Sequence, residues 1–242
     1  MSMTETDIGK CNLSIIIPTY NEAENIPELI HRIEKSLKGV DFEIIIVDDN
    51  SPDRTADIAQ KLGEEYLNIK VIKRKGKLGL ASAVLEGMKF ANGKFIAVMD
   101  ADLQHPPELL PLMLEKAYKG YDLIIASRYI KGGSIEHWSI FRKVVSLGAI
   151  SLAHLLFPKI KNIKDPISGF FMFKREIIKN IHLNPRGFKI LLEILVKGNY
   201  QSVVEVPYLF RERGKGKSKL NSKEIINYAI HLLKLKMYRL VI

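Results

Sequence analysis

Short runs of consecutive apolar residues alternate with longer segments of helical periodicity over roughly the first half of the chain. Nearly every position in the first four runs is apolar, which is typical of strands covered on both faces of a sheet. The runs predict strands at 13–18, 43–49, 69–74, 94–100 and 122–127. The intervening segments predict helices at 24–37, 53–66, 79–91 and 107–119. This alternation predicts an α/β fold with a doubly wound, mostly parallel sheet flanked by helices.

Local signals mark several ends of these elements. Ser51 and Pro52 predict the start of a helix, because a capping hydroxyl precedes a proline in the first turn. Gly39 and Gly120 predict helix ends.

The pattern is less regular beyond residue 130. It predicts helices at 141–157 and 187–197, strands at 169–173 and 202–207, and a basic loop before residue 221. Asn221 and Glu224 have the spacing of a capping box at the start of a final helix. Apolar positions at helical spacing follow, with lysines and an arginine around them. We therefore expect one catalytic domain over residues 1–220 and a C-terminal amphipathic helix over 221–242.

Composition narrows the class of protein. The chain has 242 residues, of which 47% are hydrophobic, and this is enough for one domain with a sizeable core. Its single cysteine, Cys11, excludes a disulfide framework and a cysteine-rich zinc site. The net charge of +10 favours an anionic partner such as a phosphorylated ligand, nucleic acid or an acidic lipid surface. The apolar runs are too short to span a bilayer, so we expect a chain that can lie on a membrane without crossing it.

Polar side chains follow three of the predicted strands, where an open parallel sheet binds its ligands. Asp100 and Asp102 come directly after a strongly apolar strand, and Gln104 follows them. Two carboxylates and an amide oxygen suit Mg²⁺ or Mn²⁺, ions that usually also bind substrate phosphates. An isolated pair of this kind is more often a solvated turn or a helix cap, but here it accompanies two other polar strand exits. His105 lies beside the motif and is of interest for that reason.

Asp48 and Asp49 follow another apolar strand, where a carboxylate can accept hydrogen bonds from a ribose or a base. Capping of the following helix is the alternative role for this segment. The stretch from Lys77 to Ala81 has only one glycine, which excludes a dinucleotide fingerprint or a Walker loop there.

At this point the sequence resembles a known family. The segments PTYNE, VDDNSPD, MDADLQHPPE, SRY, DPISGFF and GFKILLEIL, then EVP and a basic loop, occur in the order found in dolichol-phosphate mannosyltransferases. These are inverting, GT-A-type family 2 glycosyltransferases, with a Rossmann-like sheet. The resemblance covers the chain from Leu13 to about Leu220.

The resemblance implies roles for particular residues. The base and ribose of a nucleotide sugar would be held by Pro18, Tyr20, Glu22, Val47 and Asp49. The diphosphate and a Mn²⁺ or Mg²⁺ ion would be surrounded by Asp100, Ala101, Asp102 and Gln104. Arg128 would face the phosphates, and the donor site would be completed by Lys189, Arg213 and Lys219. The acceptor phosphate would lie near Arg142, Asp165 and Ser168.

The implied reaction moves mannose from GDP-mannose to dolichyl or another polyprenyl phosphate, with inversion. The attacking phosphate is already largely ionised near neutral pH, since its second pKa is roughly 6, so no strong general base is required. The alternatives are the same chemistry with UDP-glucose or another donor, and a family 2 transferase acting on a sugar hydroxyl. A basic α/β module that binds nucleic acid is the alternative from another class, although no basic motif interleaved with aromatic residues supports it, and we expect no nucleic-acid partner.

The expected location is the cytoplasmic face of a membrane, where the chain would be peripheral. Many members of the family continue into transmembrane helices, whereas this sequence stops at Ile242. The expectation is therefore either a short form that uses an amphipathic helix or a membrane-anchoring partner subunit, or a truncated chain.

Overall fold

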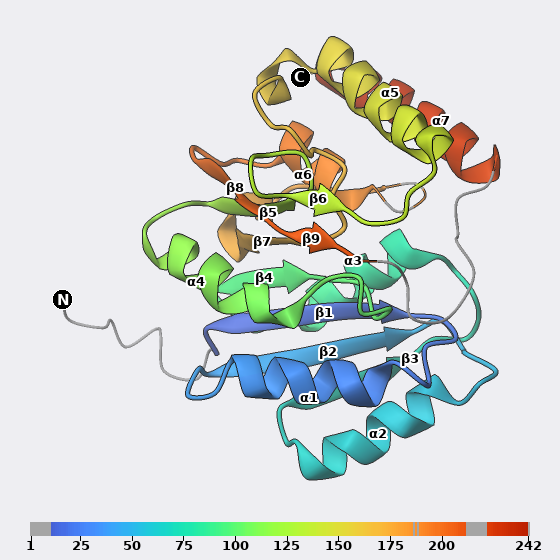
Figure 1. The fold of residues 1–242 in the computed structure, drawn as a ribbon, viewed down its shortest axis with the longest axis vertical. Coiled ribbons are helices and arrows are strands. Elements are labelled where there is room, and N and C mark those ends of the chain that lie inside the picture. The colour runs from blue at the N-terminus through green and yellow to red at the C-terminus, as the bar shows by residue number, and fades with distance from the viewer. Residues whose placement is uncertain (1–10, 186, 188, 212–221, 242) are drawn as a thin grey trace.

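The structure is a computed structural model, and it describes residues 11–185, 187, 189–211 and 222–241. One seven-stranded sheet forms its centre, with helices on both faces (Figure 1). Its strands are β1 (Leu13–Thr19), β2 (Phe42–Asp48), β3 (Ile69–Lys73), β4 (Phe95–Val98), β5 (Leu123–Ser127), β7 (Phe171–Lys174) and β8 (Val203–Pro207). The larger helices are α1 (Ile26–Ser36), α2 (Thr55–Glu65), α3 (Leu80–Phe90), α4 (Leu110–Tyr118), α5 (Ile140–Leu156), α6 (Ile190–Lys197) and α7 (Ser222–Val241).

The strand order is β3-β2-β1-β4-β7-β5-β8. All neighbouring pairs are parallel except those of β7, which runs antiparallel to both β4 and β5. The predicted mostly parallel α/β fold is thus confirmed. Because β2 and β3 lie on one side of β1 and β4 lies on the other, the order of the sheet reverses between β1 and β4. This switch is where an open α/β sheet binds ligands.

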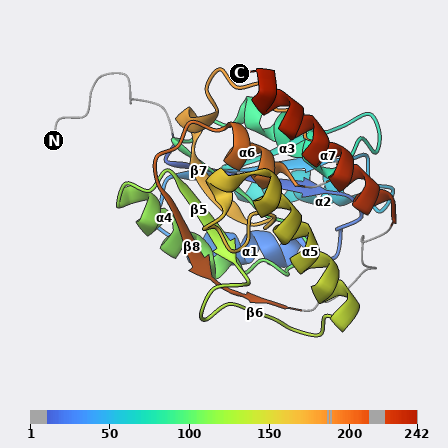
Figure 2. The ribbon, with the colours of Figure 1, turned by 90° about the horizontal axis from the view of Figure 1, so that it is seen from above.

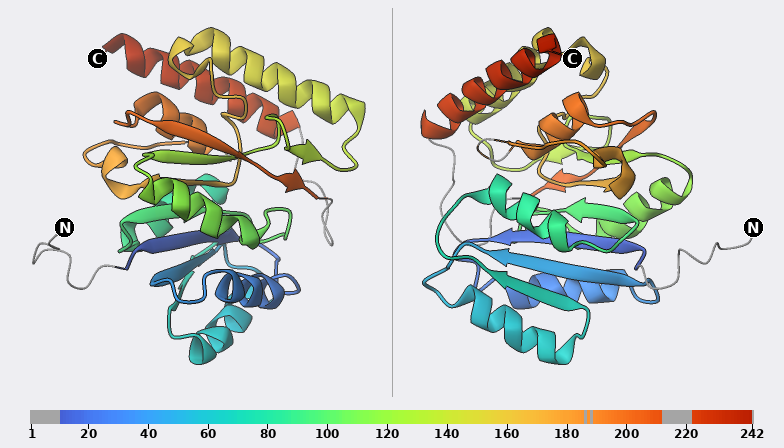
Figure 3. Two further views of the ribbon diagram at one scale, coloured as in Figure 1. Left: turned by 60° about the vertical axis from the view of Figure 1, so that its left-hand side comes forward. Right: turned by 180° about the vertical axis from the view of Figure 1, so that it is seen from behind.

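Helices cover both faces of the sheet, which explains the apolar runs of its central strands, whereas the edge strand β3 is only half-buried and has exposed lysines at Lys70 and Lys73. Ile15 and Ile17 of β1 pack in the core layer under α1, α2 and α4, and Ile16 packs in the layer under α3 and α6. The two layers of helices are visible in Figure 3. Short 3₁₀ helices also occur in the chain, at η2 (Pro107–Leu109), η3 (Pro158–Ile160) and η4 (Arg175–Ile178).

The final helix packs against the rest of the chain. Leu232 and Leu235 of α7 are buried in the second core layer, and the Tyr228 hydroxyl donates to the Ala149 carbonyl of α5 at 2.7 Å. Figures 2 and 3 show α5 and α7 side by side. The predicted capping box cannot be assessed, because Asn221 lies outside the described residues. In the described ranges, none of the helices has the length and apolar character needed to cross a bilayer.

Two features differ from the predictions. Strands β6 (Ser134–Ile135) and β9 (Leu209–Phe210) pair in a second, two-stranded sheet, and they were not predicted because two residues show no periodicity. Ser51 and Pro52 do not start a helix, since α2 begins at Thr55 after Arg54, whose φ is +67°. Ser51 is used differently: its hydroxyl donates to Asp48 of the preceding strand at 2.5 Å.

Candidate active site

The exits of β1, β2 and β4 turn sharply at the edge of the sheet where the order reverses. Asn21, Asn50 and Leu103 follow these strands and have φ values of +58°, +56° and +63°. Asparagine tolerates this left-handed conformation, but leucine rarely adopts it, and such strained residues cluster at functional sites. The strained position in the third turn lies inside the predicted acidic motif.

The acidic motif is held in place by its own neighbours. The side chain of Asp102 is almost fully buried, and its Oδ1 accepts from the Gln104 backbone N–H at 3.2 Å. The amide nitrogen of Gln104 donates to the Arg211 carbonyl at 2.8 Å. The backbone N–H of Asp100 donates to Nδ1 of His105 at 2.9 Å. The turn that presents both carboxylates is therefore fixed before any ligand binds.

The donor set of this turn fits a hard divalent cation. Asp100 and Asp102 supply carboxylates, and Gln104 supplies an amide oxygen, while its amide nitrogen donates to the Arg211 carbonyl. Within the described parts of the chain, no three His, Cys, Asp or Glu side chains could hold a metal ion by themselves. A cation held by two carboxylates and one amide would complete its shell with substrate phosphate oxygens and water, as Mg²⁺ usually does.

His105 is a buried neighbour of the motif whose role the sequence alone did not define. Its ring stacks on Phe170 with centroids 5.3 Å apart, and its Nδ1 accepts from Asp100. Burial lowers the pKa of His105, and this outweighs the nearby carboxylates, which raise it. A Cβ atom on Gly169 would lie 3.1 Å from the His105 ring and 3.3 Å from the Asp100 carboxylate. The glycine of the DPISGFF segment therefore leaves space for the imidazole and the acidic side chain.

The two aspartates after β2 have different roles. Asp48 is fully buried and accepts from the Thr19 hydroxyl at 3.0 Å and from the Ser51 backbone N–H at 2.8 Å. It therefore ties the exits of β1 and β2 together. Asp49 is paired with the buried guanidinium of Arg74 and accepts from the Gly79 backbone N–H at 2.7 Å. Its predicted contact with a ribose stays a prediction.

The remaining residues predicted for the nucleotide lie at the same sheet edge. Pro18 and Val47 are register partners in β1 and β2. Glu22 is buried and accepts from the Asn25 side chain at 2.7 Å. The ammonium of Lys77 lies 3.8 Å from the centre of the Tyr20 ring. Lys77 is a cation that the sequence analysis did not assign to the site, and only its contact with Tyr20 identifies it.

Two residues predicted for opposite halves of the site form one ion pair. Nε and Nη2 of Arg128 donate to the two carboxylate oxygens of Asp165, each at 2.8 Å, and both side chains are buried. The guanidinium fork that was predicted to face the phosphates therefore holds a protein carboxylate. The Ser168 hydroxyl donates to the Ala126 carbonyl at 2.7 Å. Direct ligand contacts of these three residues stay predictions.

The remaining predicted cations lie around the same region. The guanidinium of Arg142 lies over the ring of Trp138, 4.2 Å from its centroid. Lys189 donates from Nζ to the Ile167 carbonyl at 3.2 Å, which places it next to the loop that carries Asp165. Arg213 and Lys219 lie outside the described residues. Among the described residues, those predicted from strand ends lie at one edge of the sheet, and their roles stay predictions.

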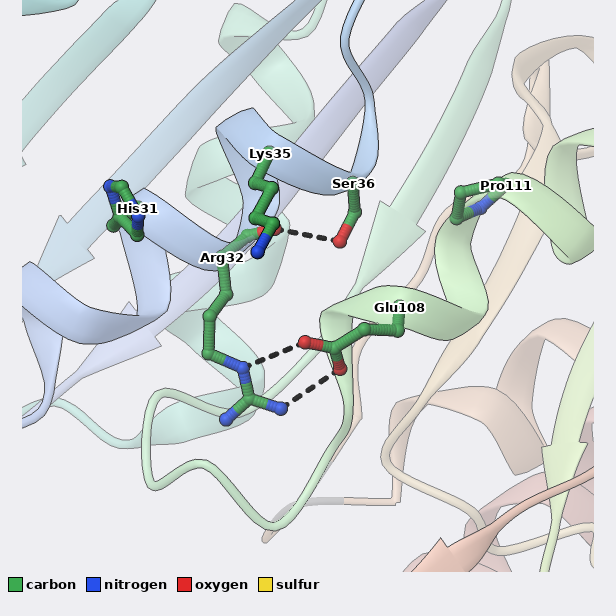
Figure 4. Close-up of a pocket in the computed structure, with 6 residues that line it drawn as sticks. All are labelled: His31, Arg32, Lys35, Ser36, Glu108 and Pro111. Carbon is green, nitrogen blue, oxygen red and sulfur yellow. Dashed lines mark hydrogen bonds and ion pairs between the residues drawn. The ribbon is translucent and has the colours of Figure 1, made fainter.

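A surface hollow between α1 and α4 contains none of the predicted site residues (Figure 4). Two of the residues that line the hollow form an ion pair: Arg32 of α1 donates from Nε and Nη2 to the carboxylate of Glu108, each at 2.8 Å. The other residues that line it are His31, Lys35, Ser36 and Pro111.

Comparisons with known proteins agree with this fold. The model of the family described as "Glycosyl transferase family 2" matches residues 14–182. A dolichol-phosphate mannosyltransferase of Pyrococcus furiosus is 52% identical over 223 residues, which cover 92% of this chain and 63% of that protein. Proteins of the same name from Mycosarcoma maydis and Saccharomyces cerevisiae are 36% and 35% identical over 93% of this chain, and 79% and 87% of their lengths are covered.

Solved structures share the fold at low sequence identity. Glucosyl-3-phosphoglycerate synthase from Mycobacterium tuberculosis, in complex with Mn²⁺, UDP-glucose and phosphoglyceric acid, has a TM-score of 0.72 and 20% identity, covering 95% of this chain and 80% of that one. Mannosyl-3-phosphoglycerate synthase from Rubrobacter xylanophilus has a TM-score of 0.70 and 20% identity, covering 95% and 74%. The chain therefore belongs to glycosyl transferase family 2, together with relatives named dolichol-phosphate mannosyltransferase.

Proposed function

We propose that this chain transfers mannose from GDP-mannose to the phosphate of dolichyl phosphate or a similar polyprenyl phosphate, with inversion at the anomeric carbon. The main observation that supports the proposal is the acidic turn of Asp100, Asp102 and Gln104, which lies where the strand order of the family 2 fold reverses. The relatives that match most of the chain are named for mannose transfer to dolichol phosphate. The chain spans 63% of the length of the Pyrococcus furiosus relative, so the activity of the whole protein is part of the proposal.

The proposed site stabilises the negative charge of a diphosphate leaving group with positive charges. A divalent cation, Mg²⁺ or Mn²⁺, would be held by Asp100, Asp102 and Gln104, and when bound it supplies positive charge that stabilises the departing diphosphate. Tyr20 and Asp49 hold the base and ribose, and Lys77 adds a cation next to Tyr20.

The acceptor needs positive charge rather than a base. A phosphate monoester is largely ionised at neutral pH, because its second pKa is roughly 6, and its repulsion from the donor diphosphate must be offset. Arg142 is half-buried near the buried pair of Arg128 and Asp165, and a guanidinium can hold two phosphate oxygens at once. Asp165 is neutralised by Arg128, which makes it a poor candidate for a proton-accepting base and disfavours the alternative in which a sugar hydroxyl is the acceptor.

We also propose that the chain works on the cytoplasmic face of a membrane, where it meets the lipid phosphate. The side chains of Ile140 and Phe141 of α5 are 82% and 72% exposed, and those of Ile226 and Leu233 of α7 are 59% and 63% exposed. Apolar side chains on two adjacent helices, with lysines nearby, suit an anionic lipid surface or a membrane-anchoring partner subunit.

The donor is tested most simply by ligand-induced thermal stabilisation, because a ligand that binds only the folded state raises its melting temperature. GDP and GDP-mannose with Mg²⁺ or Mn²⁺ should raise the melting temperature more than UDP and UDP-glucose do. A larger shift with the uridine nucleotides would replace GDP-mannose by UDP-glucose or another uridine donor in the proposal.

A further inference from the structure

Trp138 lies close to Arg142, which is proposed to bind the acceptor phosphate, and to Arg128, which was predicted to face the donor phosphates. Its ring centroid is 4.2 Å from the guanidinium carbon of Arg142 and 5.4 Å from that of Arg128. Phe210 of β9 packs against it edge to face, with centroids 5.5 Å apart and ring planes at 78°. A single aromatic ring therefore contacts both cations, and it also packs against Phe210 of strand β9.

The start of α5 builds this contact locally. Ser139 is the N-cap of the helix, and its hydroxyl accepts from the Arg142 backbone N–H at 3.2 Å. This bond fixes Arg142 in the first turn, while Trp138 immediately precedes the cap. Residues just before a cap and in the first turn commonly pack together, as in a hydrophobic staple. The ring and the guanidinium are thus brought together by the five consecutive positions 138–142 and one capping bond.

The first turn of α5 also favours an anion. It carries Arg142 but no acidic residue, and the N-terminal end of a helix has partial positive charge. An exposed arginine would sample many rotamers in this position. An aromatic ring beside the guanidinium restricts the side chain through cation–π attraction, and this attraction acts on the face of the guanidinium, whereas its N–H donors lie in its plane.

The two arginines differ in their surroundings. Arg128 donates to both oxygens of the buried Asp165, whereas Arg142 is half-buried and belongs to a helix with an exposed apolar face. Arg142 directly follows the exposed side chains of Ile140 and Phe141, on the surface that is proposed to meet the lipid.

We infer that Trp138 is a positioning residue of the acceptor site, which holds Arg142 in the orientation that receives the phosphate of the polyprenyl acceptor. The inference rests on the proposed function in two respects, the identity of the acceptor as an isoprenoid monophosphate and the binding of its phosphate by Arg142. It has an unusual consequence: Trp138 is the only tryptophan of the chain, so its fluorescence reports what happens to Arg142.

The first test uses the unmodified protein. Farnesyl phosphate should change the intensity or the wavelength of tryptophan emission in a saturable way, and farnesol at the same concentration should not. In Arg142→Gln the emission of the free protein should remain that of a folded chain, but the response to farnesyl phosphate should be lost. A wild-type emission that does not change at concentrations of farnesyl phosphate that saturate turnover would overturn the inference.

The second test separates positioning from general stability. Trp138→Leu should raise the acceptor KM about tenfold, because that is the scale of a lost cation–π contact. Trp138→Phe retains a ring and should restore most of the acceptor affinity. The affinity for GDP and the melting temperature serve as readouts of general damage. Phe90→Leu is the matched control, since Lys70 lies 4.6 Å from the Phe90 ring at a distance from the site, and it should leave the acceptor KM unchanged.

The outcomes distinguish failure of this inference from failure of the proposed function. If turnover with GDP-mannose is absent but farnesyl phosphate still changes the emission of wild type and not of Arg142→Gln, the donor assignment fails and the role of Trp138 stands. If turnover is confirmed and Trp138→Leu keeps the wild-type acceptor KM, the function stands and the role of Trp138 is wrong. An equal loss of GDP affinity and acceptor affinity in both Trp138 variants would also overturn it.

Discussion

Arg128 and Asp165 form a bidentate ion pair in which two guanidinium nitrogens each donate to a different carboxylate oxygen at 2.8 Å. The backbone N–H of Arg128 donates to the same carboxylate at 3.1 Å. Burial alone would lower the pKa of Arg128, but the charge and hydrogen bonds of Asp165 outweigh it and raise that pKa. The pair joins the end of β5 to the loop before β7, so it holds together the segments that carry the predicted acceptor residues.

Removing the carboxylate charge should destabilise the fold. Asp165→Asn leaves the buried guanidinium without its counter-charge, and breaking a buried pair in this way costs about 3–5 kcal/mol of unfolding free energy. Chemical denaturation of the two proteins measures the difference. Glu115→Gln, which breaks the exposed pair with Lys119, is the control and should cause no measurable loss. If both variants are as stable as wild type, the buried pair does not have the structural role assigned to it.

The acidic turn should be required for activity and dispensable for folding. Asp102→Asn keeps an oxygen to accept from the Gln104 N–H but removes a charge, so we expect roughly a hundredfold or greater loss of turnover, as for other lost electrostatic groups. Chelation with EDTA should have the same effect in wild type, and added Mg²⁺ or Mn²⁺ should reverse it. Circular dichroism should be unchanged in the variant. Full turnover by exhaustively chelated enzyme would refute the cation site.

His231 should make the protein less stable in mild acid. Burial is the main cause that lowers its pKa below the ordinary 6.5, with Lys197 and Lys234 acting in the same direction and Glu193 opposing them. The unfolded state therefore binds the proton more tightly, and the unfolding free energy falls as the pH drops below about 6.5.

The variant His231→Gln should make that decrease smaller, although His105, whose pKa burial also lowers, would still contribute. Urea unfolding at a series of pH values gives the slope of the unfolding free energy against pH. His31→Gln, at an exposed position on α1, should leave the slope as it is in wild type. A slope that is identical in wild type and His231→Gln would show that this buried histidine has no part in it.

Binding to lipid should depend on the exposed face of α5. The double variant Ile140→Ser and Phe141→Ser removes two large exposed apolar side chains, and it should weaken binding to anionic liposomes by about tenfold or more. Co-sedimentation measures this. Leu67→Ser changes a side chain between α2 and β3 that is even more exposed, at 93%, and it should bind like wild type. Deleting α7 is a poorer test, because the deletion would expose the core residues that pack against Leu232. Unchanged binding by the double variant would remove α5 from the proposed membrane surface.

The sheet was predictable where its strands are long and covered on both faces. Ile15–Ile17 and Ile44–Ile46 are unbroken apolar segments at the centres of two strands, because each face of the sheet has its own layer of helices. The antiparallel direction of β7 could not be predicted, since an apolar run has no direction. Strands β6 and β9 were missed because a two-residue strand leaves no pattern in the sequence.

The candidate site was predictable only as far as it depends on strand ends. Asp100 and Asp102 follow an apolar strand, and the reversal of strand order places them at a ligand-binding edge. The contact between Trp138 and Phe210 depends on the pairing of β6 with β9, so no local pattern indicates it. The same holds for Arg128 and Asp165, which are 37 positions apart. Ser51 was misinterpreted because the Asp48 carboxylate, rather than a helix end, binds its hydroxyl.

The central claim is tested most directly by following the sugar. The protein, with Mg²⁺ or Mn²⁺, is incubated with GDP-mannose labelled in the mannose and with a polyprenyl phosphate, and the lipid is then extracted. The account predicts label in the lipid fraction as a single mannose joined through the phosphate in the β configuration, opposite to that of the donor. Label that enters the lipid only from UDP-glucose, or a product that retains the donor configuration, would contradict it.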